Sequence, residues 1–158
     1  MEQPVLAVVE AGDADDVAAL AGYARLAGLT VSAQPSGHGA TGDVDGVILL
    51  RTGRLDGVDI RPGQRSVRVG AGVKWDRELT AASPHGLTGL AGSSPVPSVI
   101  GYTLGGGLSW FGRRHGFAAD SVRALDVVDA GGAGPGSPPT PTPTCSGRCV
   151  AVAATSPW

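Results

Sequence analysis

The chain has 158 residues and a formal net charge of −2, which is one domain's worth of sequence and enough to bury a single core. Because the chain carries no excess of positive charge, it has no basic surface that could neutralise the phosphates of a nucleic acid, and nucleic-acid binding is excluded. The first residues hold no basic region, and no apolar run approaches a membrane span. We therefore expect a soluble, cytoplasmic protein without a membrane partner.

The first 130 residues alternate between short apolar runs and segments of helical periodicity. A helix is predicted between Asp13, an N-cap, and Gly28, its C-terminal stop, with further helices over 75–82 and 99–104. Strands are predicted over 5–9, 29–33, 47–50, 55–60, 66–69 and 122–128. The connections are too irregular for a doubly wound parallel sheet, so the pattern favours an α+β fold.

The last 28 residues, 131–158, have a different composition. They hold six of the twelve prolines, both cysteines and a single charged residue, and they show no apolar periodicity. We expect a disordered tail here, with a domain boundary near residue 130. Cys145 and Cys149 have no histidine or carboxylate cluster beside them, so no metal site is predicted.

Two glycine-rich segments are the candidate ligand-binding regions. The first, 34–41, follows a predicted strand, and its small residues let backbone N–H groups converge on a pyrophosphate. Taken alone, a single Gly-x-Gly of this kind is more typical of a surface turn than of a phosphate-binding loop. The second runs from 92 to 107 and joins serine hydroxyls, a helix start and a triple glycine, which permits close backbone approach.

Short motifs in a fixed order give the sequence a family resemblance. They are His-Gly-Ala at 38–40, Arg-Leu-Asp-Gly-Val at 54–58, Val-Gly-Ala-Gly-Val-Lys-Trp at 69–75, Pro-His-Gly-Leu at 84–87, 91–95, 101–107, Gly-Arg-Arg-His-Gly at 112–116 and 119–124. Together they resemble the FAD-binding, PCMH-type domain of the vanillyl-alcohol oxidase and berberine-bridge-enzyme superfamily, over about residues 4–130. The resemblance implies two small α+β subdomains with FAD between them, followed in relatives by a separate substrate domain.

By this resemblance FAD is the cofactor and partner, and the two glycine-rich segments wrap it. The residues assigned to cofactor binding are Ser36, Gly37, His38, Gly39, Ala40, Ser93, Ser94, Ser98, Gly101, Thr103, Gly105, Gly106 and Val122. His38 matches the position whose imidazole is often bonded to the flavin 8α-methyl carbon, so it is the candidate for a covalent link. Ser94 stands where many relatives carry a second linking cysteine, so no second tether is expected. His85 and His115 are interpreted as structural or solvent-exposed.

The tail also resembles an out-of-frame translation of the segment that follows the last predicted strand in relatives. Relatives carry a segment like Ala-Asp-Thr-Asp-Pro-Asp-Leu-Phe-Trp-Ala-Leu-Arg-Gly-Gly-Gly-Gly-Asp-Phe, which is absent here. One synonymous, G+C-rich coding of that segment, read after dropping its first nucleotide, gives residues 139–155, and its continuation gives 156–158. We therefore interpret the tail as out-of-frame translation that begins between residues 130 and 139.

Two functional hypotheses follow. In the first, the chain is an FAD-binding fragment of a berberine-bridge-enzyme-like oxidase, inactive alone because the substrate domain is missing, so that a small-molecule substrate is a partner only of an intact relative. Such an oxidase moves a hydride from a substrate carbon to the flavin, which oxygen reoxidises. In the second, the chain is a non-catalytic remnant or binding module that holds no flavin, because a missing subdomain leaves the cofactor poorly enclosed. The sequence indicates neither catalytic residues, nor a substrate, nor an oligomeric state.

Overall fold

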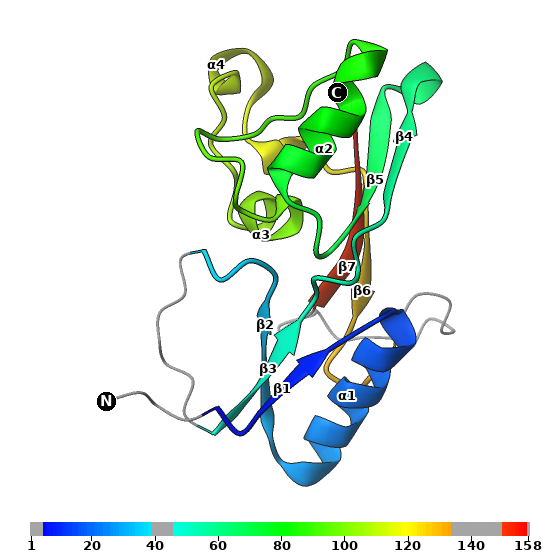
Figure 1. Cartoon of the computed structure of the whole chain (residues 1–158), viewed down its shortest axis with the longest axis vertical. Helices are drawn as coiled ribbons and strands as arrows, with labels where there is room; N and C mark the ends of the chain where they lie inside the picture. Colours follow the sequence, from blue (N-terminus) through cyan, green and yellow to red (C-terminus); the bar gives the residue numbers. More distant parts are fainter. Residues whose placement is uncertain (1–4, 39–45, 134–149, 158) are drawn as a thin grey trace.

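The computed structural model describes residues 5–38, 46–133 and 150–157. Two sheets follow one another along the long axis of the molecule (Figure 1). The lower half in that view holds a three-stranded sheet with helix α1, and the upper half holds helices α2, α3 and α4 beside a four-stranded sheet. This mixture of helices with two separate sheets confirms the predicted α+β class.

The lower half is a parallel sheet covered on one face by one helix. Its strands are β1 (Ala7–Glu10), β2 (Thr30–Gln34) and β3 (Val47–Arg51), in the order β1-β3-β2. Helix α1 (Ala14–Ala27) packs on it through Val17, which meets Leu50 of β3 in a common apolar cluster. Leu50 is only 1% exposed, as expected for the central strand of a parallel sheet.

The ends of α1 agree with the prediction from sequence. The Asp16 N–H donates to the Asp13 side chain at 2.9 Å, which satisfies one of the unpaired donors of the first turn. At the other end Gly28 adopts a left-handed conformation with φ 68°, which glycine reaches without steric strain. The helix therefore begins and ends where its cap residues stand.

The upper half is an antiparallel sheet in the order β4-β5-β7-β6. Its strands are β4 (Val58–Arg61), β5 (Ser66–Gly70), β6 (Ala124–Val128) and β7 (Val150–Pro157). The remaining elements of this half are η1 (Pro62–Gln64), α2 (Trp75–Ala82), η2 (Ser83–His85), α3 (Val99–Leu104), α4 (Gly112–His115) and η3 (Ala118–Ser121). Val67, Val69, Trp75 and Ile100 form the centre of its apolar core.

Strand β7 is the main departure from the sequence prediction. The tail is predicted to have no stable element, whereas residues 150–157 form a strand between β5 and β6. The physical reason lies in sheet pairing, because the ladder is made of backbone hydrogen bonds and needs no amphipathic period from the strand that fills it. The Pro-Thr run and both cysteines lie outside the described residues, and the boundary near residue 130 stays a prediction.

Two glycines allow the connection between the sheets to pass close to a turn. A Cβ atom on Gly70 or Gly72 would collide with the backbone carbonyl of Leu55 or Thr52, respectively. Two hydrogen bonds hold these segments together. The Gly70 N–H donates to the Gly57 carbonyl at 2.8 Å, and the Gly72 N–H donates to the Leu55 carbonyl at 2.9 Å. These glycines of the family motif therefore serve chain packing.

Candidate functional site

The first candidate segment leaves the end of β2 on the surface. His38 is exposed, and its backbone N–H donates to the Ser36 hydroxyl at 3.4 Å. Gly37 has φ +71°, so the turn uses the left-handed conformation that a glycine supplies. Gly39 and Ala40, which are also predicted to contact the cofactor, lie outside the described residues.

The second candidate segment is fixed to the start of helix α2. The Val99 N–H donates to the Val73 carbonyl at 2.8 Å, and the Trp75 N–H donates to the Pro97 carbonyl at 3.2 Å. At the start of α3 the Ser98 hydroxyl accepts the Gly101 N–H at 3.0 Å, which makes Ser98 an N-cap. The rigid part of this segment is therefore held by backbone bonds to a neighbouring helix.

The two segments meet where Pro35 approaches the first turn of α3. A Cβ atom built on Gly101 would lie 3.7 Å from Pro35 Cγ and 2.8 Å from the Ser98 hydroxyl oxygen. The distance to Pro35 is an ordinary van der Waals contact, so it is the Ser98 hydroxyl that leaves no room for a side chain at Gly101. The structure thus brings together two glycine-rich segments that are more than sixty residues apart in the sequence.

The backbone donors in the two segments fall into two groups. The N–H groups of Gly101, Gly105 and Gly106 are bonded to the Ser98 hydroxyl, the Gly101 carbonyl and the Thr103 carbonyl. Within the part of the chain that the structure describes, the N–H groups of Gly37 and Ser93 have no such partner. The first group therefore sets the shape of the surface, and the second is available to anionic oxygens of a phosphate.

The triple glycine provides an open surface beside these donors. A Cβ on Gly106, where φ is +96°, would meet nothing within 4 Å, and one on Gly105 would make only ordinary contacts of 3.5 Å with backbone carbonyls. Bare backbone of this kind allows a flat ring system to approach closely. The residues present therefore fit a flavin cofactor, because the two segments offer free backbone N–H donors and the surface near α3 is glycine backbone without side chains.

Four of the predicted cofactor residues are at least half-buried. Ser98 is 2% exposed and Thr103 is 7% exposed, so their side chains are core groups rather than surface donors. Val122 is half-buried, and its N–H donates to the Ala119 carbonyl at 3.1 Å, where it ends η3. Ser94 is also half-buried, with its hydroxyl accepting the Val96 N–H at 3.4 Å.

Sequence reasoning overlooked Tyr102, which organises the second segment. Its ring packs edge-on against Trp75, with centroids 5.5 Å apart and planes at 89°, and its hydroxyl donates to the Leu108 carbonyl at 2.5 Å. Gly92 and Gly107 both lie so close to this ring that a Cβ would come within 3.0 Å and 2.6 Å of it. An aromatic residue inside a glycine-rich motif was the available signal.

Other features of the described residues lie away from this site. A cavity of about 610 Å³ between α1 and β2 is lined mainly by apolar side chains and contains none of the predicted cofactor residues. No group of three or more metal-ligating side chains occurs in the described ranges, and no helix there is long and apolar enough to cross a bilayer. Glu78 is the one described carboxyl whose pKa burial raises to about 7, and it lies in the core of the upper half.

Comparison with known protein sequences identifies one kind of domain. The family described as "FAD binding domain" matches residues 5–133. The chain is 31% identical over 120 residues to the FAD-dependent monooxygenase tpcD of Cochliobolus heterostrophus, covering 74% of this chain and 23% of that protein. It is 30% identical over 128 residues to the FAD-linked oxidoreductase chyH of Penicillium rubens, covering 79% of this chain and 26% of that relative. The chain thus spans about a quarter of the length of these relatives.

Solved structures share the fold. A VAO-type flavoprotein from Myceliophthora thermophila is 25% identical with a TM-score of 0.78, and the match covers 94% of this chain and 31% of that one. The 6-hydroxy-D-nicotine oxidase from Arthrobacter nicotinovorans is 20% identical with a TM-score of 0.77, covering 95% of this chain and 35% of that one. Both similarities extend over nearly the whole of this chain and about a third of the solved protein.

Proposed function

The chain belongs to the family of FAD binding domains, and on that premise we propose that it holds FAD where the 35–38 segment meets the start of α3. FAD is the cofactor of this domain, which is the FAD-binding domain of FAD-linked oxidoreductases. The observation that supports this location is the approach of Pro35 to Gly101, because Gly37 follows Pro35 by two residues and Gly105 stands at the end of the helix α3 that contains Gly101.

In this proposal the residues have separate tasks. The N–H groups of Gly37 and Ser93 would donate to the pyrophosphate oxygens, which requires no basic side chain. Gly105 and Gly106 leave the backbone bare, so that the ring system can lie against α3. His38 is exposed at the end of the first loop, where an imidazole nitrogen would replace one hydrogen of the flavin 8α-methyl carbon. The methyl and imidazole protons would leave to solvent, and the two electrons would stay on the flavin until oxygen removes them.

We propose that the reaction class is the one found in berberine-bridge-enzyme-like oxidases. The chemistry that FAD would supply when bound is acceptance of a hydride from a substrate carbon, with oxygen as the final electron acceptor. We propose that residues 1–158 tested alone lack turnover, because this chain spans about a quarter of the length of the FAD-dependent relatives that it matches.

We also keep the out-of-frame interpretation of 131–158 as a proposal. The family match ends at residue 133, close to the change in composition at residue 131. The two observations are independent, since one comes from the match to the family and the other from the composition of this chain. The domain would then comprise residues 1–130 with the tail added to it.

A flavin titration tests the site. FAD fluorescence is followed as the chain is added, for the wild type and for Gly105→Val, which places a side chain on the open surface without backbone strain because Gly105 has φ −83°. Gly57→Val is the matched control, since Gly57 also has open space around it and lies away from the site. We expect Gly105→Val to weaken FAD binding about tenfold or more, a loss of ~1.4 kcal/mol or more, and the control to leave it unchanged.

The outcomes separate the hypotheses. If Gly105→Val binds FAD like the wild type, the cofactor lies elsewhere on the domain. If the folded wild-type chain binds no FAD at all, the alternative of a binding module without flavin replaces the proposal.

A further inference from the structure

The cavity of about 610 Å³ between α1 and β2 in the lower half is larger than a packing defect. Protein interiors leave few voids that exceed one water molecule, whereas pockets for small ligands hold about 300–1,000 Å³. The cavity also reaches the surface, because Arg25, Thr30 and Ser32 line it and are exposed. It is therefore accessible to a ligand, and it contains none of the residues that we assign to FAD.

One wall of the cavity is the apolar stripe of α1. Its residues follow the i, i+3, i+4, i+7 spacing of a single helix face, and they are Val17, Leu20, Ala21 and Ala24. Val17 packs against Leu50 of β3, as described above. Ala21 and Ala24, further along the helix, each carry only a methyl group. The space beside these methyl groups is the apolar part of the cavity.

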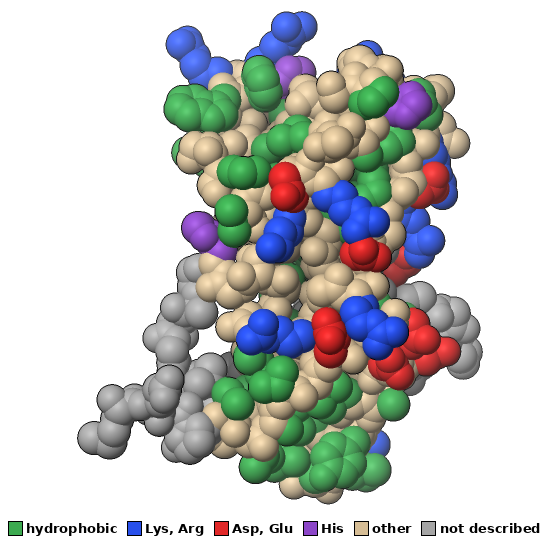
Figure 2. All heavy atoms as spheres, in the orientation of Figure 1, with side chains coloured by type: hydrophobic (Ala, Val, Ile, Leu, Met, Phe, Trp, Pro, Cys, Tyr) green, Lys and Arg blue, Asp and Glu red, His purple; other side chains and the backbone are tan. Residues whose placement is uncertain are grey.

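The other walls are also apolar. They come from the segment 29–33 around β2 and from the end of β6, where Leu29, Val31 and Val128 line the cavity. Of its lining residues only Arg25 and Asp129 carry a charge. Figure 2 shows that charged side chains gather in a band across the middle of the molecule, whereas the lower half on that face is mainly hydrophobic. A ligand in this cavity therefore makes mostly apolar contacts.

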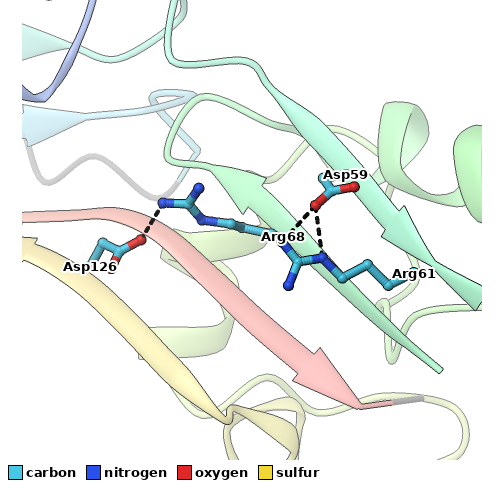
Figure 3. Close-up of polar contacts among 4 residues, drawn as sticks. All are labelled: Asp59, Arg61, Arg68 and Asp126. Carbon is cyan, nitrogen blue, oxygen red and sulfur yellow. Dashed lines mark hydrogen bonds and ion pairs between the residues drawn. The ribbon is translucent and has the colours of Figure 1, made fainter. Parts of the chain in front are cut away.

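The arginine of the cavity differs from those of the upper sheet. Arg61 and Arg68 each pair with a carboxylate, that of Asp59 at 2.8 Å and that of Asp126 at 2.6 Å (Figure 3). Within the described ranges, the guanidinium of Arg25 has neither an ion pair nor a hydrogen bond. Its planar fork of N–H donors matches the two oxygens of a carboxylate. Arg25 is therefore available to an anionic group of a ligand.

The acidic residue of the cavity is already used by the chain itself. Asp129 Oδ1 accepts the Gly131 N–H at 2.8 Å and the Ala133 N–H at 3.0 Å, which closes the turn after β6. These two donors offset part of the negative charge that an anionic ligand would meet. The charged groups of the cavity thus favour an anion that pairs with Arg25 over a cation that pairs with Asp129.

We propose that the cavity between α1 and β2 is a binding site for a small amphipathic carboxylate with an aliphatic tail. The tail lies along Ala21 and Ala24 of α1, and the carboxylate pairs with Arg25 at the mouth. The site is separate from the one proposed for FAD and stands whether or not the domain holds flavin.

Isothermal titration calorimetry of the full chain tests the proposal with hexanoate, octanoate and decanoate as probes. We expect all three to bind, and affinity to rise about two- to fourfold for each added methylene group, because each one is transferred from water to the apolar walls. Decanol, which has the same tail and no charge, should bind more weakly than decanoate. Excess FAD should leave the affinity for decanoate unchanged.

Two matched pairs of variants locate the ligand. Arg25→Gln should weaken binding of decanoate about tenfold and leave decanol unchanged, because it removes only the charged partner. Arg51→Gln is its control, since Arg51 is exposed on the lower half and does not line the cavity. Ala21→Phe fills the cavity and should abolish binding of both probes, whereas Ala19→Phe, on the exposed side of the same helix, should not.

Several results would overturn the proposal. A folded wild-type chain that binds none of the carboxylates refutes it, as does an affinity that ignores the length of the tail. If Arg25→Gln binds decanoate like the wild type, or a folded Ala21→Phe does, the ligand lies elsewhere. Loss of binding in Trp110→Ser would assign it to the exposed aromatic side chains near α4, where Trp110 is 80% exposed. If Ala21→Phe does not fold, the length series and Arg25→Gln decide.

Discussion

Glu78 makes the stability of this domain depend on pH. Its side chain is fully buried on the face of α2 that also buries Trp75 and Ala82, and neither carboxylate oxygen has a hydrogen-bond partner among the described residues. Burial without a partner disfavours the charged form, and it raises the pKa of Glu78 from 4.5 to about 7. The carboxyl is therefore protonated in the folded chain at a pH where it ionises in the unfolded one.

The sign and size of the effect follow from that difference. Because the folded-state pKa is raised, the folded chain binds the extra proton, so its relative stability is complete below pH 4.5 and is lost as pH rises through about 7. Each pKa unit corresponds to 1.36 kcal/mol, so ~3 kcal/mol of stability disappears across this range. For a chain of this size each kcal/mol moves Tm by about 2–4 °C, which predicts a fall of about 6–12 °C.

Urea denaturation between pH 5 and pH 8.5 measures this loss. Glu78→Gln keeps the shape of the side chain but cannot ionise, so its unfolding free energy should lack the steep fall, and Glu78→Leu should in addition be more stable at pH 8. Glu10→Gln, which changes an exposed carboxyl, is the control and should retain the wild-type profile. If wild type and Glu78→Gln show the same dependence on pH, the carboxyl is either solvated or paired and the reasoning fails.

The remaining predictions concern the cofactor, two local contacts and the tail. Flavin that survives acid precipitation of the wild type should be lost in His38→Ala, as measured by absorbance of the pellet; a yellow pellet from the variant would rule out this link. Asp13→Ala removes the N-cap of α1 and should cost ~1 kcal/mol in a urea titration. Gly107→Ala, with φ +72° and a Cβ only 2.6 Å from the nearest ring atom, should cost ~2–4 kcal/mol by strain and overpacking, whereas Gly106→Ala, which meets nothing, should cost only the ~1–2 kcal/mol of its backbone strain. Sequencing the DNA should show that one inserted or deleted nucleotide near the codons for 130–139 restores a longer flavoenzyme frame, and its absence in every frame would refute the out-of-frame interpretation.

Local signals in the sequence were sufficient for most elements of the fold. Helices α2 and α3 have the predicted bounds. Buried residues at helical spacing mark α2, and α3 is marked by its N-cap Ser98 and by Gly105 at its end. The predicted strands match within two or three residues, since they are β-branched runs between turn residues. These features depend on neighbours in the sequence and not on the tertiary structure.

What the sequence could not provide depends on contacts between distant segments. Strand β7 takes its conformation from the edges of β5 and β6, so nothing in its own composition predicts it. The meeting of Pro35 with Gly101 likewise exists only after both halves have folded. Glu78 was within reach of prediction, because its position three residues after Trp75 and four before Ala82 places it on the buried face of the helix.

Glycines of the family motifs have two physical roles, and the difference decides which of them can belong to a binding site. At Gly72 and Gly107 a side chain would strike the Thr52 carbonyl or the Tyr102 ring, so these positions are fixed by packing within the chain itself. At Gly105 and Gly106 a Cβ would find only ordinary contact or open space, so packing alone does not demand glycine at Gly105. Such a glycine leaves the backbone open to a ligand, and Gly105 stands at the end of α3, whose first turn meets Pro35. This is why the surface near α3, rather than the glycine-rich turn at 70–72, is the part that we propose binds FAD.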